Sequence, residues 1–297
     1  MSKKRKTSNI LSYVIIFIVI VGSYLLLNGP INRQEGLPVE NPVENSTLNN
    51  LIVEFIDVGE ADSILILTPN EKTILIDAGE PGDYEKIKET IDDYSIDKLD
   101  VVITTHPHSD HIGSMQKIIE NYDIGRVYMP DKIHTSKTFE NLLLAIEKKG
   151  LEIDIAEAGV KIDLDKAIDL TFVSPNGSFE DMNNSSAVLK LRYKDTSFLF
   201  TGDIETKAEK LIDDDLDVDV LKVGHHGSNT SSSEEFLNRV TPEIAVISVG
   251  KDNKYNHPSQ DILDILNGIG AQVYRTDEKG NITITSDGFK MEIKTER

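Results

Sequence analysis

The spacing of apolar residues changes along the chain, and these changes predict where strands and helices lie. Short runs rich in Ile, Leu and Val predict strands, whereas apolar residues four positions apart, such as Ile87 and Ile91, predict helices. Predicted strands span 51–57, 63–68, 73–78, 99–104, 169–174, 187–193, 197–202, 218–223 and 243–249, with a final hairpin around Gly280. Predicted helices span 84–94, 136–149, 205–212, 232–240 and 259–268, and one more begins near 113–114.

Strands and helices follow one another over residues 51–297, and nothing in the pattern marks a boundary inside this range. Such a succession predicts an α/β fold in which helices are layered against mixed sheets. Hydrophobic residues make up 39% of the chain, which is ample for a core. We therefore expect one globular domain at 51–297.

Residues 10–27 form an uncharged apolar run, and four basic residues at 3–6 precede it. As a helix with a rise of about 1.5 Å per residue, the run would span roughly 27 Å, close to the hydrocarbon core of a bilayer. Positive charge stays cytoplasmic, so we predict a basic cytoplasmic end at 1–9 and a single transmembrane anchor at 10–27. A cleaved signal peptide is the alternative, but the run is long for one and no clear cleavage site follows.

Residues 28–50 contain three spaced prolines and lack apolar periodicity, which predicts a flexible linker between the anchor and the domain. The domain at 51–297 would then be extracellular, on a protein of the cell membrane that crosses it once. Four of the 31 basic residues and none of the 51 acidic ones precede the anchor, so the exported part has a formal net charge of −24. A field of this sign repels long polyanions at a distance.

Residues 106–111 contain three of the seven histidines of the chain and an aspartate, directly after the predicted strand 99–104. Imidazole nitrogen and carboxylate oxygen are ligands that Zn²⁺ and related ions prefer, and a strand holds such ligands rigidly. The chain has no cysteine, so thiolate metal sites are excluded. This stretch therefore predicts a metal site at a sheet edge.

The segment 105–113 contains the pattern H-x-H-x-D-H-x-G, which resembles the signature of the metallo-β-lactamase superfamily. Segments 55–63 and 76–79 resemble the opening strands of that fold, and 201–205 resembles its later aspartate motif. Segments 222–228, 256–258 and 275–280 are similar to one subgroup, the hydrolase domain of ComEC-type DNA-uptake proteins. The resemblance covers most of the chain after Leu51. It implies a four-layer αββα sandwich with the metal site at one edge of two facing sheets.

The resemblance also implies two divalent metal ions, zinc or manganese, and the residues that bind them. His106 and His108 would bind the first ion, Asp110 and His111 the second, and Asp203 would bridge both. For Asp203 the alternative is a helix N-cap, because the predicted helix 205–212 follows it. Asp110 is also assigned a catalytic role.

The adjacent histidines His225 and His226 leave two assignments open. Neighbouring residues of a strand point to opposite faces, so only one of them could face the metals if the strand continues, whereas both could if it has ended. We take His226 as a metal ligand and His225 as a catalytic or phosphate-contacting group, with the reverse assignment remaining open.

The sequence departs from the fuller superfamily pattern, in which a third histidine often binds the first metal. Only His134 lies between the first motif and Asp203, and its surroundings do not match; the region of Asn184 and Ser186 stands in that place instead. Amide and hydroxyl oxygens are harder donors than imidazole, so Mn²⁺ fits as well as Zn²⁺. Residues predicted to bind substrate are Asn184, Ser186, Lys222, Lys254 and His257.

Three aspartates near the motif have other assignments. Asp77 is expected to hydrogen-bond a metal-bound histidine rather than bind metal itself. Asp57 and Asp62 flank Gly59 and are either turn carboxylates or groups that orient the edge of the site. A solvated loop residue is the alternative for His257.

The reaction class that these residues imply is metal-assisted hydrolysis, since such metals lower the pKa of bound water from 15.7 to about 7. The resemblance favours a phosphodiester substrate, with nucleic acid the choice implied by the subgroup. A surface phosphorylcholine or other ester hydrolase is one alternative, and a non-catalytic metal-binding module that partners DNA-uptake machinery is another. A single long apolar run excludes a multi-span pore, and the oligomeric state is left open.

Overall fold

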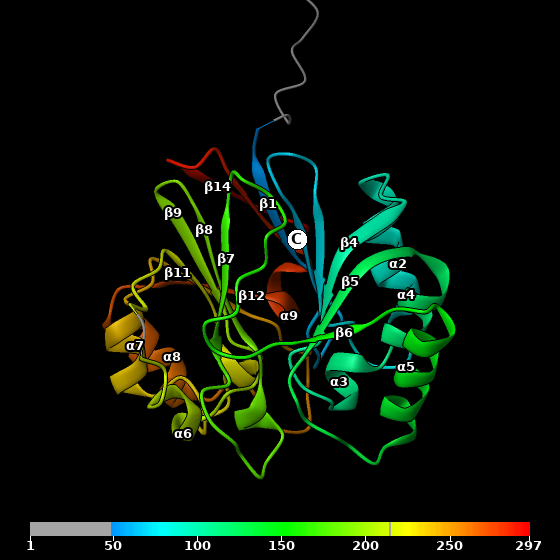
Figure 1. Ribbon diagram of the computed structural model, residues 1–297. Coiled ribbons are helices and arrows are strands. Elements are labelled where there is room, and N and C mark those ends of the chain that lie inside the picture. The colour runs from blue at the N-terminus through cyan, green and yellow to red at the C-terminus, as the bar shows by residue number, and fades with distance from the viewer. Residues whose placement is uncertain (1–48, 214) are drawn as a thin grey trace, which may run out of the picture. The chain divides into compact units, whose positions relative to one another are not determined.

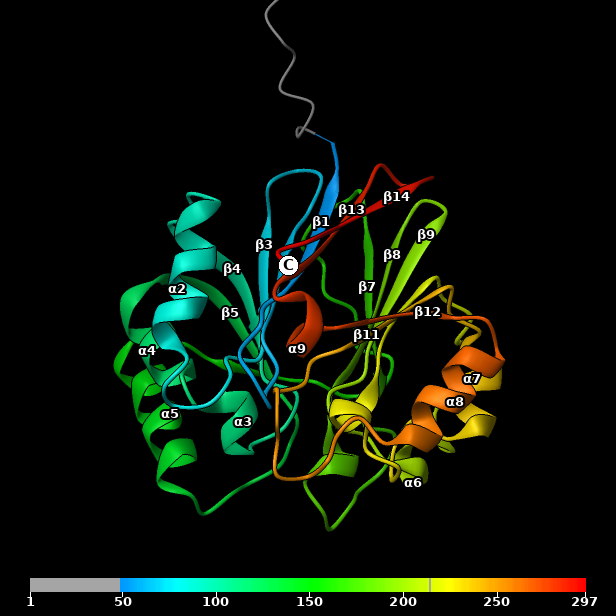
Figure 2. The ribbon, with the colours of Figure 1, turned by 180° about the vertical axis from the view of Figure 1, so that it is seen from behind.

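Two β-sheets face each other across an apolar core, and helices cover the outer face of each sheet (Figures 1 and 2). The computed structural model describes residues 49–213 and 215–297. The predictions for 1–9 and 10–27, and nearly all of the linker predicted at 28–50, lie outside the described residues.

The first sheet has eight strands in the order β14-β13-β1-β2-β3-β4-β5-β6. The strands from β3 to β6 run parallel to one another, and the remaining pairs are antiparallel. The strands are β1 (Leu51–Phe55), β2 (Ile64–Leu67), β3 (Thr73–Ile76), β4 (Lys98–Ile103), β5 (Asp123–Met129), β6 (Ile153–Ile155), β13 (Ile282–Ser286) and β14 (Met291–Thr295).

The second sheet has six strands in the order β12-β11-β10-β9-β8-β7. The strands from β9 to β12 are parallel, and β8 pairs antiparallel with both β7 and β9. The strands are β7 (Asp169–Ser174), β8 (Val188–Tyr193), β9 (Thr196–Phe200), β10 (Val220–Lys222), β11 (Ile244–Ile247) and β12 (Gln272–Arg275).

Helices form the two outer layers, one on each sheet (Figure 1). On the first sheet lie α2 (Tyr84–Asp93), α3 (Ser109–Ile112), α4 (Met115–Asn121) and α5 (Lys137–Lys148). On the second lie α6 (Thr206–Glu209), α7 (Glu234–Val240) and α8 (Gln260–Gly268). Figure 2 shows α9 (Thr276–Lys279) where the chain passes from β12 of one sheet to β13 of the other, and the short 3₁₀ helices η1 (Asn183–Ser185) and η2 (Gly224–Gly227) complete the described elements.

Alternation along the strands explains the layers. On β4, Val101 and Ile103 point into the core between the sheets, whereas Val102 packs under the helices of the first outer layer. On β9, Phe198 and Phe200 lie between the sheets. Because successive side chains of a strand point to opposite faces, an apolar run of this kind is buried on both sides. The predicted four-layer αββα arrangement is therefore present in the described chain.

Several predicted boundaries differ from the structure. The helix expected from 113–114 is instead the pair α3 and α4, and α3 begins inside the histidine motif. β5 and β6 were missed, since β5 carries Asp123, Gly125 and Arg126 and β6 is only three residues long. The final hairpin was placed wrongly around Gly280: the strands that flank Gly280, β12 and β13, belong to different sheets.

The actual hairpin joins β13 to β14 at Gly288, which has a φ of +91° that glycine adopts readily. The Asp287 carboxylate accepts hydrogen bonds from the backbone N–H groups of Phe289 and Lys290, at 2.8 Å each, which fixes the turn. Within residues 49–213 and 215–297, no helix has the length and apolar character needed to cross a membrane.

Gly113 joins α3 to α4 where the chain passes close to the turn after β3. A Cβ at this position would lie 2.3 Å from backbone atoms of Glu80 and Pro81 and 2.5 Å from the Gly79 carbonyl oxygen. Because backbone atoms cannot move aside as a flexible side chain can, Gly113→Ala is expected to lower the free energy of unfolding by roughly 3 kcal/mol. Urea unfolding midpoints measure this change. Gly82→Ala is the matched control, since a Cβ there meets nothing within 4 Å, and equal midpoints for both variants would contradict the prediction.

Candidate metal centre

Three strands from both sheets end at the same edge of the sandwich and bring the candidate ligands there. β4 of the first sheet ends just before His106, whereas the parallel neighbours β9 and β10 of the second end before Asp203 and His225. Side chains that follow such strand ends face the crevice beyond the sheet. Figure 1 places this edge at the bottom of the domain, where α3 lies.

The carboxylate of Asp203 lies at the centre of the cluster and is 1% exposed. Its Oδ2 atom is close to the Nε2 atoms of four imidazoles, which come from both sheets. The distances are 3.8 Å to His106, 3.3 Å to His111, 3.7 Å to His225 and 3.8 Å to His226. Three of the predicted ligands, His106, His111 and His226, therefore converge on Asp203 together with His225, and Asp203 lies between residues of both sheets.

The backbone at His225 and His226 decides between the two arrangements left open. Both residues have left-handed conformations, with φ of 50° and 54°, so the strand has ended and both rings reach Asp203. The Nδ1–H of His226 donates to the Ser248 carbonyl oxygen at 2.9 Å, which leaves Nε2 facing Asp110 Oδ2 at 3.5 Å. His226 thus has the orientation of a ligand.

His225 is oriented differently and lies nearer the solvent. Its Nδ1 is 3.6 Å from a carboxylate oxygen of Glu205 and 3.3 Å from the Thr230 hydroxyl, whereas its Nε2 points toward Asp203. A carboxylate behind one ring nitrogen favours the proton on that nitrogen and leaves the other available at the site. This position fits the catalytic or phosphate-contacting role predicted for His225.

The orientation of the His111 ring is fixed by Asp77. The Nδ1–H of His111 donates to Asp77 Oδ2 at 2.8 Å, so Nε2 faces Asp203. The same carboxylate accepts the backbone N–H of Thr105 at 2.7 Å and the Thr105 hydroxyl at 2.6 Å. The predicted contact between Asp77 and a motif histidine is present.

His106 and His108 form the other side of the cluster. His106 is fully buried, and its Nε2 is 3.0 Å from Nδ1 of His108. The ring of His134, from the loop before α5, lies 6.0 Å from the ring of His108 and lines the same cleft. The sequence pattern gave His134 no matching context, so its place here comes from the tertiary structure. All seven histidines of the chain are now accounted for at this edge.

The donor atoms fit a divalent cation. Ligand atoms of Asp110, His111, Asp203 and His226 lie within 4.8 Å of one another. Among the described residues, three buried atoms of this group have no hydrogen-bond partner, namely Asp203 Oδ1, His111 Nε2 and His226 Nε2. Buried polar atoms without partners are costly, so a cation held by this oxygen and nitrogen set would satisfy them. His106, whose Nε2 lies 3.8 Å from Asp203 Oδ2, and the neighbouring His108 would serve a second ion.

Charges in the cluster perturb one another strongly. Although burial opposes ionisation, the imidazoles of His111 and His226 hold the pKa of Asp203 well below its usual range. Burial likewise works against a charged His226, but Asp203 and Asp110 raise its pKa to about 9. Burial lowers the pKa of His106 well below its usual value, which favours the neutral form that binds metals.

Three residues predicted to bind substrate are instead buried outside the cleft, where they support the site. Asn184 is fully buried, and its side-chain oxygen accepts the backbone N–H groups of Glu205 and Ala208 at the start of α6. The Ser186 hydroxyl accepts the backbone N–H of Asp203 at 3.2 Å. Lys222 is 1% exposed and forms an ion pair with Asp62 at 2.9 Å. None of the three lines the cleft.

Lys254 and His257, the other two predicted contacts, lie at the rim. The cleft has a volume of about 410 Å³ and opens onto the metal cluster. His257 lines it, and the exposed Lys254 belongs to the same loop. The lining residues are His108, Ser109, Asp110, His134, Ser136, Asn183, Asp203, His225, His226, Tyr255 and His257.

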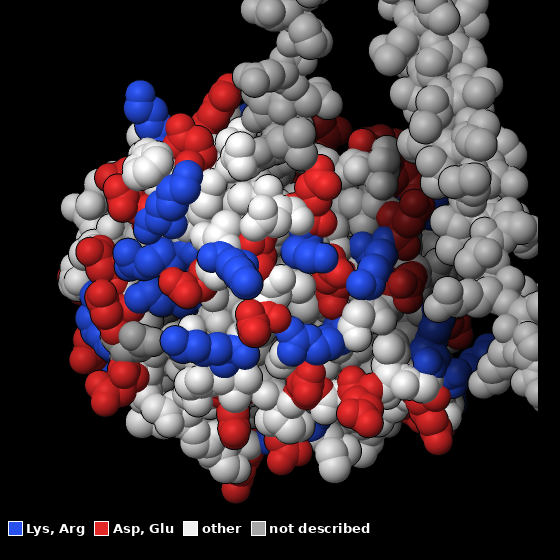
Figure 3. All heavy atoms as spheres, turned by 45° about the horizontal axis from the view of Figure 1, so that its top comes forward, with Lys and Arg blue, Asp and Glu red and all other residues white. Residues whose placement is uncertain are grey.

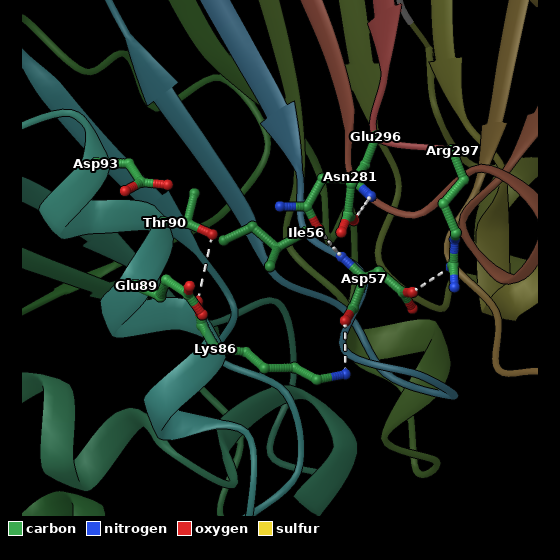
Figure 4. A pocket seen from close by; sticks show the side chains of 9 residues that line it. All are labelled: Ile56, Asp57, Lys86, Glu89, Thr90, Asp93, Asn281, Glu296 and Arg297. Atoms are coloured by element: carbon green, nitrogen blue, oxygen red, sulfur yellow. Dashed lines mark hydrogen bonds and ion pairs between the residues drawn. The ribbon is translucent and has the colours of Figure 1, made fainter.

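Asp57 lies in a different hollow, away from the histidines (Figure 4). Its carboxylate faces Arg297 at 2.7 Å, and its backbone carbonyl accepts from the ammonium of Lys86 at 3.0 Å. Its Oδ1 accepts the backbone N–H of Gly59 at 3.4 Å, so Asp57 is a turn carboxylate. Asp62, in contrast, is buried beside the cluster, with Oδ1 3.7 Å from Nδ1 of His226, so it orients the edge of the site.

Comparison with known proteins identifies the family. The family model described as "Metallo-beta-lactamase superfamily" matches residues 56–251. The chain therefore belongs to the metallo-β-lactamase superfamily, as the sequence motifs predicted.

Curated relatives include competence proteins. ComE operon protein 3 of Bacillus subtilis is 32% identical over 251 residues, which cover 77% of this chain and 32% of the relative. Competence protein ComA of Neisseria gonorrhoeae is 31% identical over 242 residues, covering 78% of this chain and 32% of the relative. The predicted relationship to ComEC-type competence proteins is confirmed, although the chain spans only about a third of the length of these relatives.

Solved structures share the fold. The diiron β-hydroxylase CmlA from Streptomyces venezuelae matches with a TM-score of 0.51 and 15% identity, covering 78% of this chain and 53% of its own. The metallo-β-lactamase fold protein YhfI from Bacillus subtilis matches with a TM-score of 0.50 and 10% identity, covering 75% of this chain and 95% of its own.

The buried ion pair between Lys222 and Asp62 yields a stability prediction. Lys222→Met leaves the Asp62 carboxylate buried without its counter-charge, so we expect the free energy of unfolding to fall by about 3–5 kcal/mol. Lys98→Met is the matched control, because the pair of Lys98 and Asp100 has the same 2.9 Å separation with the lysine 49% exposed, and an exposed pair contributes at most about 1 kcal/mol. Similar losses in the two variants, measured by urea unfolding, would refute the prediction.

Metal binding at this cluster should depend on pH. Because Asp203 and Asp110 raise the pKa of His226 to about 9 against the effect of burial, this imidazole holds a proton at neutral pH that a metal must displace. The apparent affinity for Zn²⁺ or Mn²⁺ is therefore expected to rise as the pH increases toward 9. Titration calorimetry in buffers of different ionisation enthalpy measures the released protons. Heats that do not vary with the buffer would contradict this expectation.

Proposed function

We propose that the protein is a metal-dependent hydrolase that cleaves phosphodiesters, with nucleic acid as its natural substrate class. The observation that carries the proposal is the convergence of Asp203 with four imidazoles beneath an open cleft. Relatives named as competence proteins support the substrate class. Bound at this centre, divalent ions would supply a water activated for attack at neutral pH and positive charge for the phosphoryl oxygens.

The chain's own residues position the reacting groups. Asp77 and the Ser248 carbonyl fix the rings of His111 and His226, so the ligand nitrogens need little rearrangement. His225, held from behind by Glu205 and Thr230, presents Nε2 to the cleft and can contact a phosphoryl oxygen or carry a proton there. Asp110 lines the cleft beside His226 and fits its double assignment as ligand and catalytic group.

The negative net charge of the chain favours binding of a short substrate, or local contact with a longer one, over binding of a long polyanion along a basic groove. The formal net charge is −20. Figure 3, in which the end of the domain away from α3 is turned toward the viewer, shows basic and acidic side chains interspersed on that face. Long-range attraction of a polyanion is therefore weak. This charge is the observation that favours the second candidate, hydrolysis of a phosphorylcholine or other small surface ester. A non-catalytic metal module would not need the open cleft.

We also propose that the protein is anchored in the cell membrane with its domain outside the cell. The apolar run at 10–27 and the basic residues at 3–6 support this location. Membrane association would place the hydrolase beside DNA-uptake machinery, and the relatives named as competence proteins support this role.

The hydrolase proposal is tested with a simple phosphodiester. The protein loaded with Mn²⁺ is expected to hydrolyse bis(p-nitrophenyl) phosphate, and His108→Ala is expected to abolish turnover while the variant remains folded by circular dichroism. p-Nitrophenyl phosphorylcholine and carboxylic esters, assayed in parallel, distinguish the second candidate. Absence of turnover of the diester with Mn²⁺, Zn²⁺ and Mg²⁺ would rule out the phosphodiesterase.

A further inference from the structure

The rim of the cleft carries an aromatic side chain that the metal centre does not use. Tyr255 lines the cleft together with His225 and Asp203, yet 57% of its surface is exposed. An exposed aromatic ring beside a polar cleft is a ready contact for a flat apolar group. The ring of Tyr255 therefore lies where a ligand in the cleft would contact it.

The loop that presents Tyr255 is held in place by two side chains. The amide of Asn253 accepts the backbone N–H groups of Tyr255 and His257 at 3.1 and 2.9 Å and donates to the His257 carbonyl at 2.7 Å. Glu60, from the first sheet's side of the fold, accepts the Gly250 N–H at 2.9 Å and contacts Nδ1 of His257 at 3.0 Å. The loop is thus fixed before any ligand arrives, which lowers the entropic cost of binding.

The ring of Tyr255 already takes part in a stack. It lies over the ring of His257, with centroids 5.5 Å apart and planes 21° from parallel. The ammonium of Lys254 lies 4.7 Å from the centroid of the same tyrosine ring. His257 in turn meets the ring of His225 edge to face, with centroids 5.8 Å apart and planes at 68°, so a row of ring contacts leads inward to the metal cluster. A planar ring added to Tyr255 would lengthen this row, and the exposed ammonium of Lys254 would be near any phosphate attached to it.

We propose that Tyr255, held against His257, stacks on an unpaired nucleobase next to the phosphodiester in the cleft, so that the preferred substrate is a single-stranded nucleic acid. This inference rests on the proposed phosphodiesterase function. Aromatic side chains bind single strands through the faces of the bases, which a duplex covers with neighbouring base pairs. Stacking does not depend on net charge, so it supplies affinity where the acidic chain offers little attraction for phosphates.

The test compares three labelled probes with the metal-loaded full chain: an oligothymidylate, an abasic strand with the same number of phosphates, and a blunt duplex. We expect kcat/KM for the oligothymidylate to exceed that for the abasic strand and the duplex by about tenfold or more. Tyr255→Ala should remove most of this preference for bases, whereas Tyr255→Phe should keep it.

Phe289→Ala is the matched control. Phe289 is 64% exposed and has the ammonium of Lys194 4.8 Å from its ring centroid, but it lies in the turn between β13 and β14. Its removal should leave the preference unchanged. Equal cleavage of base-bearing and abasic strands by the wild type, an unaltered preference in Tyr255→Ala, or duplex cleavage as fast as single-strand cleavage would overturn the inference.

Binding measurements separate this inference from the proposed function. If no phosphodiester probe is hydrolysed, the proposed function fails. Fluorescence anisotropy of the same probes with wild type, Tyr255→Ala and Phe289→Ala still reports whether the tyrosine supplies base-dependent affinity. Affinity for the oligothymidylate that equals that for the abasic strand would then overturn the stacking inference as well.

Discussion

The burial of one carboxylate among four imidazoles is the constraint on which the rest of the site depends. Asp203 and its neighbours are stable only if their charges are compensated in a region that excludes water. Compensation comes in part from the protein, through hydrogen bonds from His111 to Asp77 and from His226 to the Ser248 carbonyl. Among the described residues, the buried atoms of the cluster that still lack a hydrogen-bond partner are those that an added cation would bind.

The sandwich makes this concentration of charge possible. Each sheet contributes loops that follow parallel strands, and the aromatic core between the sheets, including Phe198 and Phe200, keeps the two edges together. Lys222 at the end of β10 places a buried cation against Asp62, so one of the aspartates under the site is neutralised by the fold itself. Lys222, which the sequence analysis predicted as a substrate contact, is therefore part of the structural support of the site.

The rim of the cleft is built differently from its floor. The floor is built from groups whose positions are fixed by charge and burial, whereas the rim presents Tyr255 and Lys254 from a loop that Asn253 and Glu60 hold rigid. The residues that carry out the chemistry and those that select the substrate can therefore lie on separate elements, since the sequence of a loop varies more easily than that of the strands that position the metal ligands.

The sequence by itself determined the fold class, most strands and the ligand types, because apolar alternation and clustered histidines are local signals. Asp203 was identified through the resemblance of segment 201–205 to the aspartate motif of the superfamily. Only the tertiary structure decided that His134 joins the cleft, that Asn184 and Lys222 are turned inward, and that both His225 and His226 reach one carboxylate. The physical reason is that these outcomes depend on contacts between distant segments and on a left-handed backbone turn, neither of which the spacing of residues along the chain encodes.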